Sequence, residues 1–367
     1  MMNIQTIINK ILWYYHKYEN YAQITFFFGG FLWDNLTLTR IDRLSDNIIL
    51  FLYIALMGFF IILMNLSEVG RLRRKTLKKY SEWYPLAIQF LQGGLFSSYV
   101  VFYFKSASLT KTIIFVVILG ILLVANEFLE KKLANVKLQF ILFFLVNFSF
   151  FAFFLPVLFK KMSSLIFYLS GSVSMGIILV YLWLFQGKLC LISRRQAVGI
   201  GIRITALFVL LNFFYWQNWI PPVPLSLKEA GVYHSVRKTG HVYDLKFQKP
   251  RWFQFWKRSD DPFFYANGDT VYCFSAVFAP TRLRTRIYHH WQFFDARSKR
   301  WETTDKLGFP LTGGRNGGYR GYTYKTHIAD GRWRIDVEAA DGAVVGRINF
   351  RVIHSPAGER QFVNRKD

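Results

Sequence analysis

The stretch LQFILFFLVNFSFFAFFLPVLF, residues 138–159, decides the fold because no charged side chain interrupts it. A helix needs about 20 apolar residues to cross the hydrocarbon layer of a membrane. Comparable stretches lie on both sides of it. The sequence therefore predicts six transmembrane helices, at 47–65, 85–104, 112–127, 138–159, 165–185 and 200–219.

A shorter apolar segment at 21–33 precedes these six and contains Gly29 and Gly30. It is either a tilted span or a re-entrant segment, and counting it gives a transmembrane domain of about seven helices over residues 21–220. Residues 1–20 lack the apolar core and cleavage site of a secretory signal peptide. Their apolar residues recur at helical spacing opposite polar ones, which predicts an amphipathic helix at the membrane interface.

The orientation follows from the basic residues in the short loops. With a cytoplasmic N-terminus, the inner segments hold fourteen Lys and Arg and the outer loops hold six. Cytoplasmic loops carry an excess of these residues in membrane proteins. The asymmetry therefore predicts a cytoplasmic N-terminus and a C-terminal domain on the opposite side, which in a bacterial inner membrane is the periplasm.

Composition supports lipid as the solvent for part of the chain: 53% of the residues are hydrophobic and 39 are Phe. The net charge of +24 is spread over loops and domain instead of gathering on one of them, so nucleic acid is not predicted as a partner. Membrane lipids are the predicted partners. The two cysteines, Cys190 and Cys273, fall on opposite sides of the predicted membrane, so no disulfide is expected.

The last span ends at a proline-rich boundary. Pro221, Pro222 and Pro224 prevent the helix from continuing. We therefore expect a linker at 221–230, a β-domain at 231–355 and a flexible tail at 356–367.

Alternating apolar and polar residues predict strands in the C-terminal domain. The dipeptide Asp341-Gly342 is a strong hairpin signal, and a two-residue loop there would place Trp333 opposite Phe350, Ile335 opposite Ile348 and Asp336 opposite Arg347. Together with five other strand-like runs this predicts an antiparallel, immunoglobulin-like β-sandwich. The fold class is thus an α+β membrane protein. The other runs are 231–236, 241–247, 270–278, 286–294 and 318–327.

No catalytic residue, cofactor or metal site is predicted. The sequence lacks the G-x-S-x-G, H-E-x-x-H, phosphate-loop and dinucleotide-binding motifs. Six of the seven histidines lie in the C-terminal domain, but the adjacent His289 and His290 point to opposite faces of a strand and cannot chelate one ion as neighbours.

The candidate ligand site combines aromatic rings with cations: His289 and Trp291 in one expected strand, and Arg320, Tyr322 and Lys325 in another. Such groups bind sugar rings, carboxylates and phosphates by stacking and paired hydrogen bonds. The same residues also suit a sandwich core in which arginine stems cover apolar surface, so both interpretations stay open.

The site requires a break in strand geometry. Arg320 and Lys325 are five residues apart and point to opposite faces of a regular strand. A bulge at Gly321 would bring both cations to one site, with Arg320 beside His289 or Trp291 at the domain surface.

At these positions the chain resembles uncharacterised bacterial membrane proteins that carry a C-terminal domain of unknown function. The matching motifs are His-x-Trp at 289–291, Tyr-Arg-x-Tyr-x-x-Lys at 319–325 and Gly-x-Trp-Arg-x-Asp-Val at 331–337. The chain departs from the pattern at Tyr319 and Tyr322, where the family often has Trp. The resemblance implies an architecture and no biochemical activity.

The sequence thus predicts an inner-membrane protein that presents a periplasmic β-sandwich as a non-catalytic binding module. Its ligand would be an envelope component: an anionic glycan, a lipid headgroup or a partner protein. Two other classes stay open. One is a membrane-embedded enzyme or transporter that uses the helical bundle, and the other is a structural assembly factor.

Overall fold

The computed structural model describes residues 43–367 except 73, 107–109, 128–134, 251, 255, 282, 316 and 356–359. The predicted interfacial helix at 1–20 and the short apolar segment at 21–33 lie outside the described residues. The described helices are α3 (Leu44–Glu68), α4 (Lys75–Lys79), η1 (Ser81–Trp83), α5 (Tyr84–Ser106), α6 (Thr110–Glu127), α7 (Val136–Phe159), α8 (Ser164–Trp183), η3 (Leu184–Lys188) and α9 (Arg194–Trp216).

Several of these helices begin where the sequence supplies a cap. Before α9, the Ser193 hydroxyl accepts a hydrogen bond from Gln196 N at 3.3 Å, and the Gln196 side chain accepts one from Ser193 N at 2.9 Å. This is a capping box. Before α7, Asn135 Oδ1 accepts a hydrogen bond from Lys137 N at 3.0 Å. These side chains satisfy backbone donors that the first turn of a helix leaves without partners.

Five of the described helices are long and apolar enough to cross a membrane, judged by length and composition: α3, α5 with η1, α7, α8 with η3, and α9. The apolar part of α6 is shorter, Ile113–Ala125. All six predicted spans are therefore helical, and five of them have the dimensions of a span.

The chain divides into two compact units, and the first contains most of the helical residues. Within it, close contacts use small and polar residues. A Cβ on Gly58 of α3 would lie 2.1 Å from the hydroxyl of Tyr181 in α8, so glycine permits this approach. Asn65 Nδ2 of α3 donates to Gln139 Oε1 of α7 at 2.7 Å. Such packing is typical of helix pairs in lipid.

The second unit comprises residues 103–115, 155–167 and 214–367. Besides the β-domain it holds five helix ends: the C-terminal ends of α5, α7 and α9 and the N-terminal ends of α6 and α8. Met162, in the α7–α8 connection, packs against a buried cluster of the β-domain. The Tyr215 hydroxyl donates to Asp341 Oδ2 at 3.0 Å, and its ring stacks on Phe167 with centroids 3.8 Å apart.

The β-domain contains three sheets with strand orders β1-β5-β8, β4-β10-β9-β6-β7 and β11-β3-β2. Pairing is antiparallel except between β10 and β4. The strands are β1 (Ser226–Tyr233), β2 (Ser235–Thr239), β3 (Val242–Gln248), β4 (Phe263–Tyr265), β5 (Val271–Phe278), β6 (Arg284–Asp295), β7 (Arg300–Thr312), β8 (Tyr319–Lys325), β9 (Gly331–Ala339), β10 (Val344–His354) and β11 (Phe362–Lys366).

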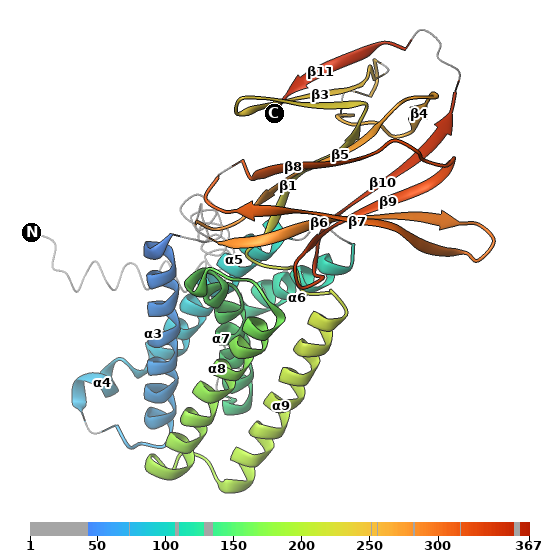
Figure 1. The fold of residues 1–367 in the computed structure, drawn as a ribbon. Coiled ribbons are helices and arrows are strands. Elements are labelled where there is room, and N and C mark those ends of the chain that lie inside the picture. Colours follow the sequence, from blue (N-terminus) through green and yellow to red (C-terminus); the bar gives the residue numbers. More distant parts are fainter. Residues whose placement is uncertain are drawn as a thin grey trace, which may run out of the picture. The chain divides into compact units, whose positions relative to one another are not determined.

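These sheets form three layers, where the sequence predicted an immunoglobulin-like sandwich of two (Figure 1). Strand β5 is buried on both faces, so it reads as a continuous apolar run. Val271 and Cys273 face the five-stranded sheet. Phe274 and Ala276 face the sheet of β2, β3 and β11. The middle layer therefore carries a separate core on each side.

The predicted register of the β9–β10 hairpin is confirmed: Trp333 pairs with Phe350, Ile335 with Ile348 and Asp336 with Arg347. The turn itself is longer than predicted. Ala339 exchanges hydrogen bonds with Ala343 and Gly342, and Gly342 has a φ of +84°. This is a three-residue loop with glycine in the left-handed region, and a bulge before Gly346 restores the register.

Two boundaries differ from prediction, and one long strand was not predicted. The linker ends earlier, because β1 begins at Ser226. The predicted tail is a strand over Phe362–Lys366, because β11 pairs with β3. Strand β7 was not predicted, since its residues are mostly exposed and include Pro310. Proline and exposed side chains suit its edge position in the sheet.

Candidate functional site

Two of the predicted site residues, His289 and Trp291, lie in the core between β6 and β5 and have no exposed surface. His289 Nε2 is 2.8 Å from the Ser275 hydroxyl, and His289 Nδ1 is 2.9 Å from that of Thr323. Trp291 Nε1 donates to the same Thr323 oxygen at 3.1 Å. These polar atoms are satisfied inside the protein, so they hold two sheets together and present nothing to a ligand.

Burial lowers the pKa of His289 to about 3. The ring is therefore neutral near pH 7, because desolvation disfavours the charged form. A neutral imidazole matches its two hydroxyl partners, since each hydroxyl either donates or accepts.

The two predicted cations lie on opposite faces of β8. Pairing of β5 with β8 is regular through Gly321, so the predicted bulge is wrong. Arg320 Nε donates to Asp367 Oδ2 at 2.6 Å. Lys325 forms an ion pair with Asp305. Both cations are therefore paired with acids of the same chain.

Tyr322 is 38% exposed, and its ring lies among other tyrosines, 6.0 Å from Tyr272 and 6.4 Å from Tyr243 between centroids. Of the five predicted residues, the structure joins only His289 and Trp291, through Thr323. They do not form one ligand site.

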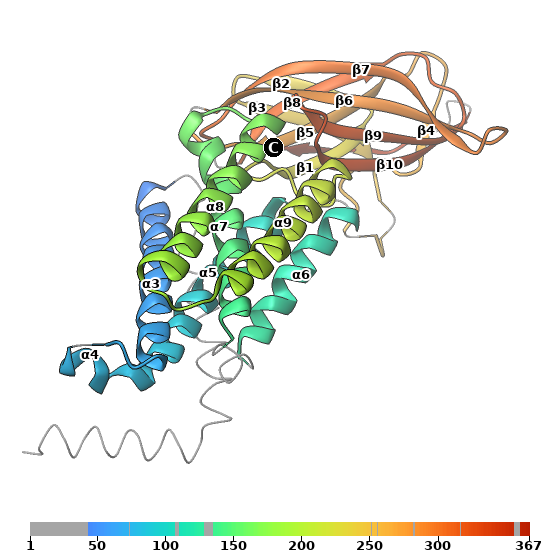
Figure 2. The same cartoon turned by 90° about the horizontal axis from the view of Figure 1, so that it is seen from below.

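A different concentration of charge covers the outer face of the five-stranded sheet, where β7, β6, β9 and β10 run side by side (Figure 2). This face, which we call the arginine face, is opposite the core that contains Trp333 and Ile335. Its cations outnumber its acids. The charged residues are Arg284, Arg286, Lys306, Arg332, Arg334, Arg347 and Arg351 against Asp336 and Glu338.

One half of the arginine face is internally neutralised. Arg347 donates from Nε and Nη2 to the two oxygens of Asp336 at 2.5 and 2.7 Å, and these bonds raise the pKa of the Arg347 guanidinium. Glu338 lies 2.6 Å from Lys306 Nζ and 2.7 Å from His290 Nδ1. Both acids are buried, which a carboxylate tolerates only when it is paired.

The other half is different, because Arg332 and Arg351 are direct cross-strand partners. Like charges in that position repel each other. Among the described residues, no ion pair within 4 Å joins either of them to an acid. Asp330 is occupied by His354, whose Nδ1 is 2.6 Å away; this bond, with a smaller contribution from Arg351, lowers the pKa of Asp330.

Aromatic rings hold the guanidinium groups of Arg332 and Arg334 in place. Arg332 lies over Phe294 at 4.6 Å and over Trp301 at 5.9 Å, and Arg334 lies over Trp301 at 4.4 Å. Arg334 also donates to Gln292. Partial burial, together with the charge of Arg347, lowers the pKa of Arg334, although arginine remains charged. We call Phe294, Trp301, Arg332, Arg334 and Arg351 the arginine platform.

The sequence contained a signal for this platform. The predicted hairpin register already places Arg332 opposite Arg351, since both flank the confirmed pair of Trp333 and Phe350. Trp301 was not foreseen because it lies on the unpredicted strand β7.

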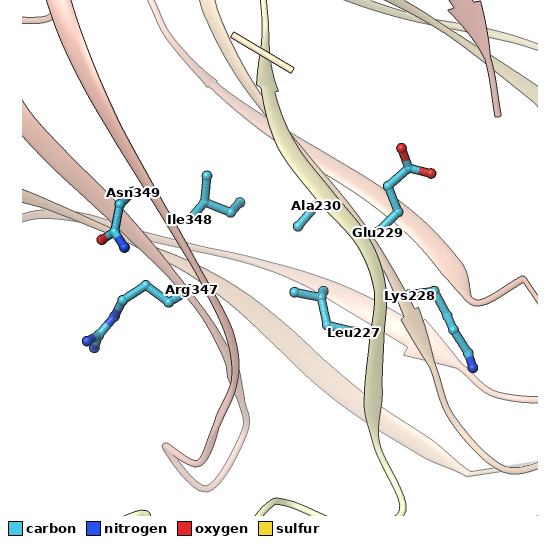
Figure 3. Close-up of a pocket in the computed structure, with 7 residues that line it drawn as sticks. All are labelled: Leu227, Lys228, Glu229, Ala230, Arg347, Ile348 and Asn349. Carbon is cyan, nitrogen blue, oxygen red and sulfur yellow. The ribbon is translucent and has the colours of Figure 1, made fainter. Parts of the chain in front are cut away.

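A pocket of about 320 Å³ lies between β1 and β10 (Figure 3). Leu227, Ala230 and Ile348 point into it, whereas Glu229 and Arg347 point away. Those two are bound to Arg365 and Asp336. The carboxylate of Glu229 and the guanidinium of Arg347 are therefore paired outside the pocket, and we assign no ligand to it.

Comparison with known proteins identifies one domain. A family described as "Protein of unknown function (DUF2914)" matches residues 284–352. The chain thus carries this domain of unknown function at its C-terminus, and all five residues of the arginine platform lie within it. No curated protein matches the chain.

Two solved structures show weak similarity. A β-glucosidase from Listeria innocua in complex with gluconolactone is 10% identical with a TM-score of 0.19, covering 32% of this chain and 17% of that one. A Pseudomonas fluorescens alkylpurine DNA glycosylase, AlkC, bound to DNA is 12% identical with a TM-score of 0.20, covering 76% of this chain and 80% of that one. Scores this low carry no argument about fold or function.

Proposed function

We propose that this protein is a bacterial inner-membrane protein whose periplasmic β-domain binds an anionic polymer of the cell envelope, without catalysis, through the arginine platform. The ligand carries carboxylate or phosphate groups. The observation that carries the proposal is the pair of Arg332 and Arg351, which are set opposite each other and, in the part of the chain that the structure describes, form no ion pair with an acid.

Membrane insertion is supported by the five long apolar helices. The orientation is supported by the excess of Lys and Arg in the inner loops. It also agrees with the composition of the second unit, because the helix ends that belong to it are all on the predicted outer side. The β-domain is then periplasmic.

An anion at the platform relieves the repulsion between the two arginines. A guanidinium group offers two parallel N–H donors to a carboxylate or phosphate, and stacking on an aromatic ring fixes its plane. Arg332 lies over Phe294 at 4.6 Å, and Arg334 lies over Trp301 at 4.4 Å. Since Trp301, Arg332 and Arg351 come from three different strands, a ligand must span the sheet, which suits a polymer better than a single small anion.

The test uses the full chain in nanodiscs of zwitterionic lipid, with polygalacturonate as a carboxylate polymer, polyphosphate as a phosphate polymer and dextran as a neutral one. We expect at least one polyanion to bind and dextran not to bind. Substitution of two cations by Arg332→Gln with Arg351→Gln should weaken binding about tenfold or more, because charge-assisted hydrogen bonds contribute about 1.5–3 kcal/mol each. Added salt should weaken it further.

The matched control removes two exposed cations elsewhere in the domain, by Arg237→Gln with Arg297→Gln, and thus has the same net charge. It should retain nearly full affinity. Equal weakening by both double variants would show that the overall charge attracts the polymer and that the platform is not a site. Absence of binding to either polyanion would refute the proposal.

A further inference from the structure

A loop between β3 and β4 exposes large aromatic rings. Within residues 249–259, Trp252 is 92% exposed, Trp256 is 64% exposed and Phe253 is 44% exposed. The rings of Trp252 and Phe253 meet edge to face, with centroids 5.9 Å apart. Clusters of exposed aromatic residues mark interaction surfaces.

The base of this loop is fixed by buried polar groups. Asp260 Oδ1 accepts a hydrogen bond from Gln248 N at 2.9 Å, which closes the loop across its ends. Asp260 Oδ2 lies 2.8 Å from Nδ1 of His234, and the Asp260 side chain has no exposed surface. Asp260 N also donates to Val232 O at 2.8 Å. The end of the loop is therefore held at Asp260, and the exposed rings precede it in the chain.

The charges of the loop have one sign. The segment KPRWFQFWKRS, residues 249–259, contains four basic residues and no acid. Asp260, the first acid after it, is bound to His234. Lys257 and Arg258 thus flank the exposed rings without an acidic neighbour in the loop.

This combination identifies the partner chemistry. Tryptophan rings prefer the headgroup layer of a bilayer. Each Lys or Arg near an anionic bilayer raises the affinity of the protein segment for that bilayer roughly fivefold. A neutral glycan would use the rings but would have no use for the cations. The chain also has five helices that suit a membrane, and a tether of this kind raises the local concentration of lipid around the domain.

We propose that the described part of this segment, residues 252–254 and 256–258, is a lipid-contact loop, which inserts Trp252 and Trp256 into the interface of an anionic bilayer. The surface is separate from the arginine platform and shares no residue with it.

The experiment places a fluorophore in the loop of the full chain. Cys190→Ser removes the exposed thiol, Cys273 is fully buried, and Gln254→Cys accepts an NBD label. The protein is placed in nanodiscs, and vesicles are added, both with phosphatidylcholine and phosphatidylglycerol at about a 7:3 ratio. Nitroxide-labelled lipid is put either in the discs or in the vesicles. We expect quenching from one of these two sources, which also identifies the bilayer contacted.

Matched variants separate the loop from other surfaces. Trp252→Ser with Trp256→Ser should abolish quenching, whereas Tyr324→Ser, which removes a ring that is 57% exposed on β8, should not change it. Lys257→Gln with Arg258→Gln should lower the partition coefficient of the loop into the bilayer roughly 25-fold. The same variant should remove the dependence of quenching on phosphatidylglycerol.

A label at Ser298→Cys, in the β6–β7 turn, should remain unquenched. The proposal is overturned if neither bilayer quenches the loop label, if the double tryptophan variant is quenched like the parent, or if the label responds only to added envelope glycan. Binding of polyanions by the platform is measured separately, so the two proposals fail independently.

Discussion

Acidification should destabilise the β-domain through His289. This side chain is fully buried, and burial lowers its pKa to about 3, against 6.5 for an ordinary histidine. The unfolded chain therefore binds a proton near pH 6.5 that the folded domain excludes. Stability from this group is fully present above pH 6.5 and is lost as the pH falls toward 3.

The expected size follows from these two pKa values. At pH 5 the unfolded state holds almost one proton at this site, compared with about a quarter of a proton at pH 7, and the folded state holds almost none at either pH. The free energy of unfolding should fall by about 2 kcal/mol over that interval. Most carboxylates titrate at lower pH, so the interval isolates histidine.

Cys273 provides the assay. Its thiol is fully buried in β5, in the same core, and burial raises its pKa. In the full chain with Cys190→Ser, urea unfolding is followed by the reaction of Cys273 with 4,4′-dithiodipyridine, which reacts with thiols at acidic pH. The variant His289→Gln keeps a donor and an acceptor but does not titrate. Its stability should depend less on pH than that of the parent by about 2 kcal/mol between pH 7 and 5. Equal slopes for the two proteins would refute the reasoning.

Two further substitutions test the packing of the sheets by the same thiol assay. Gly321→Ala should destabilise the domain by about 1–3 kcal/mol, because its Cβ would lie 2.3 Å from the ring of Phe309; Phe309→Leu should restore part of the loss, and no destabilisation would show that the ring moves freely. Arg347→Ala should cost about 3–5 kcal/mol by leaving the buried Asp336 carboxylate without its partner. The double variant Arg347→Leu with Asp336→Leu should recover most of this loss. A double variant as unstable as Arg347→Ala would contradict the assigned role.

Local chemistry determined much of this protein from its sequence. Length and apolarity were sufficient to predict the helices of residues 47–219, because a membrane span needs little more than those properties. The β9–β10 register was also predictable, since a glycine turn and period-two alternation fix which residues are opposite. Both signals lie within one segment or between adjacent segments.

Only the tertiary structure decided which aromatic and basic residues are available to a ligand. In sequence, His289 and Trp291 are indistinguishable from a binding motif, and the packing of β5 and β8 against β6 turns them into core. Arg320 is paired with Asp367, 47 positions away in the sequence. Conversely, the arginine platform exists because an unpredicted edge strand carries Trp301 to Arg332 and Arg334. Exposure and pairing depend on contacts between distant segments, and no local pattern encodes them.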